Sequence, residues 1–400
     1  MKIVWLCTFS DAEKASHLSL WRNARGEYGK WIPNLLKAFK GDVNYELHVV
    51  SFQYWMRNLY CTWKSEGITY HCFQPHFPPF GFNARIPFEE MTRFQWNRWR
   101  VRRLLSRIQP DLVHLFGLEN PRYATSVLDL PKGFPCVCTV QGFASRELNY
   151  NDCLVNRVRA RYEKLIAQRV KYFFTDCEGG QLIKSWNPDA VIDNMYFPVD
   201  EDLVAATPPQ SLEYDALFAG GQTKAKGFGD FLNICAYCAE RKPDFRAAVV
   251  GTADAYQGTV EFMTRHHLEH VITFTGRFPT QEGLFVAYRK SKTFLAPTYN
   301  DAFASTIREN MLLGTPCIAY KTGGIPFANN DGNENVVIVN QGDWRTMAER
   351  VLYYAQHENE RRLLADRAKS FAERTFSLEV NAQLIKIMYN KILKEHKNVV

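Results

Sequence analysis

The sequence lacks long apolar runs. Its longest ones, such as KIVWLC and ALFAGG, are far shorter than the ~20 residues that a membrane-spanning helix needs. Lys2 is followed by only about five apolar residues, too few for the core of a secretory signal. The sequence therefore predicts a protein of the cytoplasm.

Paired cysteines are also scarce. Ten cysteines are spread along the chain, and Cys235 and Cys238 form a lone C-x-x-C inside the helical stretch FLNICAYCAE. Structural zinc needs four ligands, so we expect reduced thiols and no metal. The D-x-D-like run Asp200–Asp202 lies in a proline-containing linker, where a solvated acidic stretch is favoured over a metal site.

Two nucleotide-binding signatures are missing. No G-x-G-x-x-G follows the first strand-like run, which disfavours a dehydrogenase, and no G-x-x-x-x-G-K-[ST] loop is present. The net charge of +7 comes entirely from residues 1–200. No recognition motif accompanies this charge, so we expect no nucleic-acid partner.

What the sequence does contain is a regular alternation of short apolar runs and amphipathic stretches. It occurs twice, on either side of the linker FPVDEDLVAATPPQSLE, and from Trp344 onward the pattern is helical only. Strands that alternate with helices predict parallel sheets covered by helices on both faces. The sequence therefore predicts an α/β protein with two doubly wound domains, residues 1–197 and 198–375, and a late helix, 376–400, that returns to the first domain.

Ligands of such sheets bind beyond the carboxyl ends of the strands. In the second half, glycines follow several strand-like runs there, and glycine lets the backbone approach a ligand closely. Basic side chains in the same loops suit a phosphate group. The candidate ligand-binding residues in these loops are Gly220, Gly221, Lys224, Lys226, Gly251, Gly276 and Arg277. A glycine-rich turn with solvated lysines is the alternative for the first loop.

The stretch NDAFASTIREN places two carboxylates, Asp301 and Glu309, eight positions apart across a predicted helix start. Thr306 and Glu309 fit a capping box, in which the glutamate would serve the helix alone. Asp301 has the alternative of a plain loop acid.

As a set, FAGG…KG, VVG, TFTG, the D-x7-E step, GTPCIAY and TGGIP resemble the donor half of retaining glycosyltransferases of the GT-B fold, family 4 type. The resemblance implies two Rossmann-like domains facing across a cleft. It implies that Lys226 binds the diphosphate of a nucleotide sugar, Glu309 the ribose, and Asp301 the sugar hydroxyls. It also implies that backbone N–H groups of Phe303, Ala304, Ser305 and Thr306 help Asp301 to hold the sugar hydroxyls, and that the helix start at Thr306 faces the diphosphate.

The function that the resemblance implies is metal-independent transfer of a hexose with retention, without a cofactor. A UDP-sugar is favoured over a GDP-sugar as donor, with a glycan or lipid-linked acceptor in cell-surface polysaccharide biosynthesis. The chain departs from the family pattern at Gly221, in place of an arginine, at Asp301, in place of a glutamate, and at Gln141, in place of a histidine. A degenerate, binding-only relative and a nucleotide-sugar epimerase are the alternatives.

In the first half, Gly26, Glu27, Gly29, His114 and Gln141 are the candidate acceptor-side residues, although a histidine after a strand is often simply buried. The stretch Arg93–Arg107 sets tryptophans among arginines. This composition suits contact with an anionic membrane, on the inner face of the plasma membrane. A helix with a solvated basic face is the alternative.

Overall fold

The computed structural model describes residues 1–8, 17–20, 31–75, 86–251 and 258–398. By their internal contacts these fall into two units. The first unit comprises Met1–Pro198 and Leu378–Val400, and the second comprises Val199–Ser377. The boundaries predicted from the sequence lie within two residues of these limits, at 197/198 and 375/376.

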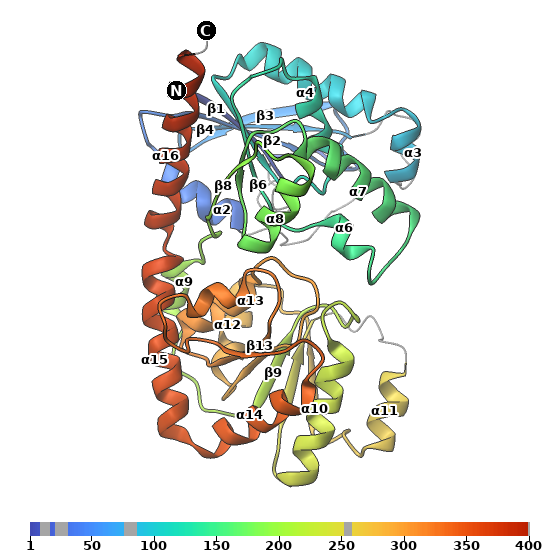
Figure 1. The fold of residues 1–400 in the computed structure, drawn as a ribbon, viewed down its shortest axis with the longest axis vertical. Helices are drawn as coiled ribbons and strands as arrows, with labels where there is room; N and C mark the ends of the chain where they lie inside the picture. Colours follow the sequence, from blue (N-terminus) through green and yellow to red (C-terminus); the bar gives the residue numbers. More distant parts are fainter. Residues whose placement is uncertain (9–16, 21–30, 76–85, 252–257, 399–400) are drawn as a thin grey trace. The chain divides into compact units, whose positions relative to one another are not determined.

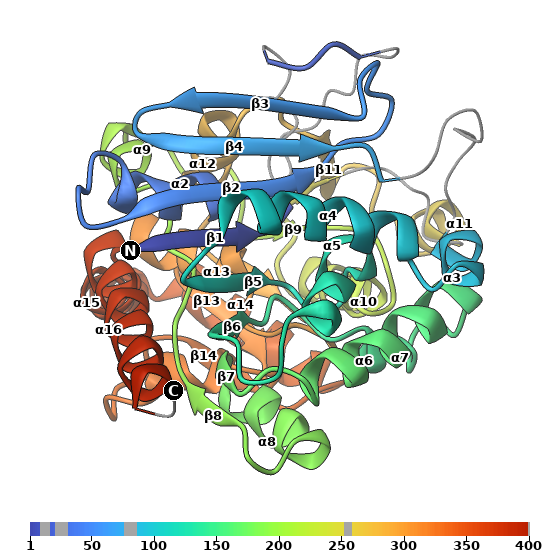
Figure 2. The ribbon, with the colours of Figure 1, turned by 90° about the horizontal axis from the view of Figure 1, so that it is seen from above.

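The first unit contains an eight-stranded sheet in the order β3-β4-β2-β1-β5-β6-β7-β8, which can be followed in Figure 2 from β3 near the top to β8 near the bottom. All neighbours pair in parallel except β3 and β4, which form an antiparallel hairpin. The strands are β1 (Lys2–Leu6), β2 (Glu46–Phe52), β3 (Tyr60–Ser65), β4 (Ile68–Phe73), β5 (Leu112–Phe116), β6 (Cys136–Thr139), β7 (Tyr172–Phe174) and β8 (Val191–Asp193).

Helices cover both faces of this sheet. Apolar side chains of α4, α7 and α8 pack on one face, and those of α2 and α16 pack on the other. The helices described in this unit are α2 (Trp31–Leu36), η1 (Lys37–Phe39), α3 (Ile86–Met91), α4 (Gln95–Ile108), α5 (Pro121–Ala124), η2 (Thr125–Asp129), α6 (Ala144–Glu147), α7 (Leu154–Ala167), α8 (Cys177–Trp186) and α16 (Leu378–Lys397).

The C-terminal helix α16 belongs to the first unit, as the sequence predicts. Its Ile385, Met388 and Tyr389 are buried against Trp5 of β1 and Leu35 of α2. Figure 1 shows α16 (dark red) beside α2 (blue), although the two helices are separated by most of the chain.

The second unit contains a six-stranded, fully parallel sheet in the order β11-β10-β9-β12-β13-β14. Helices α10 and α14 pack on one face, and α13 contacts β12 and β13. The strands are β9 (Ala216–Ala219), β10 (Ala247–Val250), β11 (Ile272–Gly276), β12 (Phe294–Ala296), β13 (Cys317–Tyr320) and β14 (Val337–Val339). The helices are α9 (Glu201–Ala206), α10 (Phe228–Arg241), α11 (Thr259–Arg265), α12 (Gln281–Arg289), α13 (Ser305–Leu313), η3 (Ile325–Asn329), α14 (Trp344–Gln356) and α15 (Glu358–Thr375).

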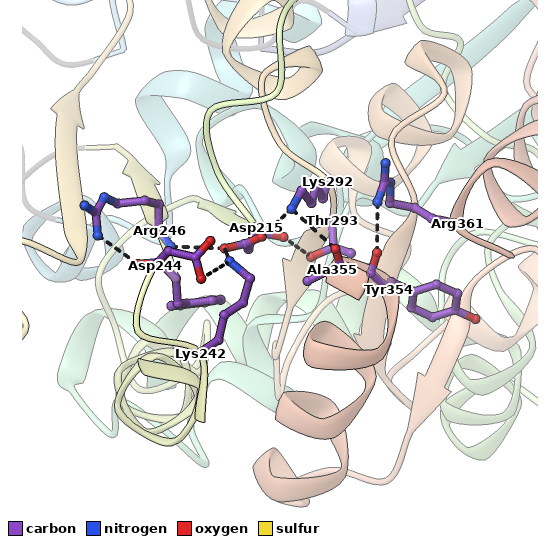
Figure 3. A network of polar contacts seen from close by, with 10 residues as sticks. Asp215, Lys242, Asp244, Arg246, Lys292, Thr293, Tyr354, Ala355 and Arg361 are labelled. Atoms are coloured by element: carbon purple, nitrogen blue, oxygen red, sulfur yellow. Dashed lines mark hydrogen bonds and ion pairs between the residues drawn. The ribbon is translucent and has the colours of Figure 1, made fainter. Parts of the chain in front are cut away.

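The amino edge of this second sheet carries an ion-pair network centred on the buried Asp215 (Figure 3). Asp215, 4% exposed, precedes β9 and pairs with the Nζ atoms of Lys242 and Lys292 at 3.1 and 2.8 Å. It also accepts a hydrogen bond from the backbone N–H of Arg246. One carboxylate therefore joins the starts of β9, β10 and β12 to the end of α10, on the edge opposite to the glycine loops.

Among the described helices, none is long and apolar enough to cross a membrane. All ten cysteines are free thiols, and Cys235 and Cys238 are buried in α10. Burial raises the pKa of the Cys238 thiol to about 12.

Candidate functional site

The carboxyl edge of the second sheet brings the predicted loops next to one another. Gly220 follows β9, Gly251 follows β10, Gly276 ends β11, and Pro297 follows β12; these four strands are adjacent in the sheet. The backbone N–H of Gly220 donates to Val250 O, and that of Gly251 donates to Gly276 O. The residues named from the sequence thus share one edge.

Two glycines make this packing possible. Gly227, at φ +68°, precedes α10 and lies so close to Pro297 that an added Cβ would be 1.8 Å from Pro297 O. Gly323, at φ +52°, would place a Cβ 2.1 Å from Asp301 O. Only glycine fits these two positions, so the 297–304 loop is held between the turn before α10 and the turn before η3.

Lys226 and Asp301 meet at this edge. Lys226 Nζ lies 2.6 Å from Asp301 Oδ2, across 75 residues of sequence. The lysine side chain is 41% exposed and the aspartate side chain 18% exposed. A cation and a carboxylate at the mouth of a glycine-rich edge can bind phosphate oxygens and sugar hydroxyls respectively.

Glu309 lies inside α13 rather than at its cap. The helix begins at Ser305, with Ala304 as N-cap and no side-chain cap hydrogen bond. Glu309 is one turn further on, so the capping box considered from the sequence is wrong: the N-cap is Ala304, two residues before the Thr306 that this pattern requires. The helix start consequently offers backbone N–H groups at Ser305 and Thr306 that no side chain caps.

The Glu309 carboxyl group is buried, with 8% of the residue exposed. Burial raises its pKa to about 7, against the lowering effects of Arg308, the Tyr288 hydroxyl and Gln281. Gln281 Nε2 donates to Glu309 Oε1 at 3.3 Å. Gln281 and Tyr288 come from α12, and nothing in their own sequence surroundings marked them as candidates.

The remaining donor-side candidates are placed as follows. Lys224, Gly221 and Arg277 are exposed, and Ala304, Ser305 and Thr306 are half-buried. Phe303 is buried, with its ring 5.3 Å from that of Phe376, so it serves the packing of the loop while its backbone remains part of the edge. A Cβ added at Gly221 would meet only Thr223 Cγ2, at 3.7 Å, so the missing arginine is not excluded by space.

In the first unit, the prediction that His114 lies on the acceptor side is wrong. It is fully buried within β5, and its ring nitrogens lie 2.6 Å from Tyr389 Oη and 2.7 Å from Thr139 Oγ1. Burial lowers its pKa well below the ordinary value. Both nitrogens already have partners, so His114 belongs to the core and not to a ligand site.

Gln141 does lie at the carboxyl edge, after β6. Its Oε1 and the carboxylate of Glu119 converge on Gly117, which follows β5. Burial raises the pKa of Glu119 to about 7. Glu119 Oε2 and Gln141 Nε2 are buried without a hydrogen-bond partner among the described residues, so both can serve a ligand. Gly26, Glu27 and Gly29 lie outside the described residues.

Only some of the basic side chains of helix α4 are exposed. Arg100 is 1% exposed and donates to Gln74 O, and Arg98 pairs with Asp129, so neither is available to a membrane. Trp96 and Trp99 are 48% and 40% exposed, and Arg102, Arg103 and Arg107 are exposed as well. The guanidinium of Arg103 lies 5.5 Å from the centre of the Trp99 ring.

Part of the chain is similar in sequence to known glycosyltransferases. Residues 200–371 match the family model of glycosyl transferases group 1, which lies within the second unit. D-inositol 3-phosphate glycosyltransferase of Corynebacterium aurimucosum is 31% identical over 143 residues, 34% of each chain. N-acetyl-alpha-D-glucosaminyl L-malate synthase of Bacillus anthracis is 23% identical over 155 residues, 39% of this chain and 40% of the relative. The matched stretches thus span well under half of these curated relatives.

Among solved structures, sucrose-phosphate synthase from Thermosynechococcus elongatus has a TM-score of 0.76 at 15% identity, over 99% of this chain and 100% of that one. The Anabaena protein HepE, solved in complex with UDP, has a TM-score of 0.68 at 16% identity, over 98% of this chain and 100% of that one. These likenesses confirm the predicted fold class: the chain consists of two Rossmann-like domains, as in GT-B glycosyltransferases.

Proposed function

We propose that the protein is a glycosyltransferase that moves a hexose from a nucleotide sugar to a hydroxyl group of an acceptor. As the donor, a UDP-sugar is favoured over a GDP-sugar. The observation that supports this most is the contact of Lys226 with Asp301 at the carboxyl edge of the unit that contains the match to the glycosyltransferase family model. HepE, which has the same fold, is described in complex with UDP and with UDP-glucose.

The ion pair suggests how the donor is bound. The diphosphate of a nucleotide sugar competes with Asp301 for the Lys226 ammonium group. When the diphosphate takes the lysine, the Asp301 carboxylate is released to accept hydrogen bonds from sugar hydroxyls. Lys226 and the uncapped start of α13 then stabilise the negative charge that develops on the leaving diphosphate.

We further propose retention at the anomeric carbon without a metal or cofactor. On this reading no side chain is needed as a separate base, because the leaving phosphate accepts the proton of the acceptor hydroxyl on the same face of the sugar. Glu119 and Gln141 are the residues of the first unit that we propose for the acceptor side.

The acceptor class follows from two different indications. The sequence resemblance favours a glycan or lipid-linked acceptor for a cell-surface polysaccharide. The curated relatives are named for small acceptors, D-inositol 3-phosphate and L-malate. An acceptor screen therefore has to include both kinds of compound.

The test of donor binding is thermal stabilisation by UDP-, GDP-, ADP- and dTDP-sugars. We expect one nucleotide class to raise the midpoint of unfolding, and Lys226→Ala or Glu309→Ala to lower the affinity at least tenfold. Lys290→Ala, which removes a partly exposed ion pair with Glu213, is the matched control. If no nucleotide sugar stabilises the protein, the binding-only alternative replaces this proposal; if the donor is isomerised without an acceptor, the epimerase alternative does.

We also propose peripheral contact of α4 with anionic membrane, through Trp96, Trp99, Arg102, Arg103 and Arg107. Exposed tryptophans beside arginines suit the boundary between lipid headgroups and acyl chains. We expect Arg102→Glu with Arg103→Glu to lower co-sedimentation with phosphatidylglycerol-containing vesicles at least fivefold. Lys391→Glu with Lys397→Glu on α16 changes the net charge equally and should have little effect. Equal binding by both double variants would contradict this proposal.

A further inference from the structure

One carboxylate near the candidate donor site has no role in the preceding proposal. Asp230 lies in the first turn of α10, four residues after Lys226. Its Oδ2 atom accepts two hydrogen bonds, from the Tyr299 hydroxyl at 2.6 Å and from the Tyr320 hydroxyl at 2.8 Å. An ionised carboxylate oxygen accepts two such bonds readily, and bonds to a charged group are stronger than neutral ones.

The two tyrosines come from different parts of the edge. Tyr299 lies in the 297–304 loop, two residues before Asp301, whereas Tyr320 is the last residue of β13. Their rings pack edge to face, with centroids 5.4 Å apart. Asp230 therefore ties the loop that carries Asp301 to the helix that follows Lys226, and ties both to the rigid sheet.

Backbone contacts reinforce this link. The N–H of Tyr299 donates to Ala225 O at 2.8 Å, and Thr322 Oγ1 donates to Thr298 O at 2.6 Å. Gln341 Nε2 donates in turn to Thr322 Oγ1 at 2.7 Å. These bonds set the backbone of the loop at its start, and the Tyr299 side chain is what attaches it to α10.

From this geometry we propose that Asp230 is a positioning residue: through Tyr299 it fixes the 297–304 loop, so that Asp301 stays within reach of Lys226 and of the donor sugar. The inference rests on the proposed roles of Lys226 and Asp301 in donor binding. It predicts that Asp230 affects recognition of the sugar more than recognition of the nucleotide.

The first test needs no nucleotide. Tyr299→Phe removes one hydroxyl group and keeps the ring, and Tyr320→Phe removes the equivalent hydroxyl from the same carboxylate but from a residue of the sheet. We expect amide hydrogen exchange of residues 298–304 to become about tenfold faster in Tyr299→Phe and to change less than twofold in Tyr320→Phe. Unchanged exchange in Tyr299→Phe would overturn the positioning role.

The second test separates sugar from nucleotide by calorimetric titration with UDP and with UDP-glucose. We expect Tyr299→Phe and Asp230→Ala to weaken UDP-glucose binding 3- to 10-fold and UDP binding less than twofold. A merely structural defect would weaken both equally, and that result would overturn the inference. The double variant Asp230→Ala with Tyr299→Phe should bind like Asp230→Ala, because both changes break the same link.

The two tests also separate this inference from the proposed function. A wild-type protein that binds neither compound would count against the proposed function, whereas the exchange measurement would still decide whether Asp230 holds the loop through Tyr299.

Discussion

At the scale of single residues, Glu309 is a carboxyl group whose burial opposes its ionisation. It is a buried carboxyl group on α13, and burial raises its pKa from 4.5 to about 7. A folded-state pKa above the unfolded-state value means that ionisation of this group destabilises the fold. The destabilisation is complete above pH 7 and absent below about pH 4.5. A carboxyl group whose ionisation destabilises the fold is a candidate for ligand binding, because it does not contribute to stability at neutral pH.

We therefore predict that Glu309→Gln raises the free energy of unfolding at pH 8 by about 1–3 kcal/mol, and by much less at pH 5. Urea unfolding at the two pH values measures this difference. Glu360→Gln, at an exposed position, is the control and should change stability little at either pH. A destabilised Glu309→Gln at pH 8 would contradict the prediction.

The same carboxyl group predicts a pH dependence of binding. A carboxylate accepts hydrogen bonds from two ribose hydroxyls, whereas the protonated acid does so poorly. We expect the affinity for UDP-glucose to fall as the pH drops through about 7, by up to tenfold per pH unit. In Glu309→Gln the affinity should be low and nearly independent of pH between 6 and 8. A wild-type affinity that stays constant over this range would show that Glu309 does not accept these bonds.

The placement of Lys226 and Asp301 at one edge was predictable because parallel strands bring their following loops together, whatever their separation in sequence. Their direct ion pair was not predicted. The capping box was wrong because the spacing of Thr306 and Glu309 does not by itself say where the helix begins. The prediction for His114 was wrong because the sequence does not say whether a histidine near the end of a strand is buried or faces a ligand. Asp230, Gln281 and Tyr288 carried no signal, since their importance arises from contacts across the unit and not from spacing.

At the scale of elements, the apolar runs predicted the strands with buried faces well. The hairpin β3–β4 does not follow from apolar runs, because β3 has no buried side chain and its polar and apolar residues alternate without a clear run. Strands β8 and β14 give little signal, because each has three residues and lies at an edge of its sheet. For α4 the helix was predicted, but its buried arginine was not, since composition alone does not say which basic side chains face the core.

The starts of three strands in the second unit depend on Asp215. We predict that Asp215→Asn lowers the stability of this unit by about 2–4 kcal/mol, because two partly buried lysines lose their shared counter-charge. Glu213→Gln breaks the more exposed pair with Lys290 and should lower stability by less than about 1 kcal/mol. The midpoint of thermal unfolding measures the effects of both variants. Samples with and without nucleotide are compared. Equal small effects would mean that the amino edge is held by its backbone bonds alone.

At the scale of the whole molecule, the chain returns to its beginning. The Tyr389 hydroxyl of α16 accepts a hydrogen bond from Trp5 Nε1 at 2.8 Å and lies 2.6 Å from His114 Nδ1. These residues are 384 and 275 positions apart, and all three are fully buried. The core of the first unit thus includes α16, which follows the second unit in the sequence.

This arrangement predicts which unit a change in the last helix weakens. Tyr389→Phe leaves the Trp5 N–H and a His114 nitrogen buried without a partner, which we expect to lower the stability of the first unit by about 2–4 kcal/mol. The second unit contains no residue of α16, so its unfolding transition and its stabilisation by nucleotide should stay unchanged. Calorimetry with and without UDP distinguishes the transitions, and Tyr353→Phe, 38% exposed on α14, is the control. A shift of both transitions by the same amount would mean that the two units unfold together, so that the return of α16 stabilises the entire chain.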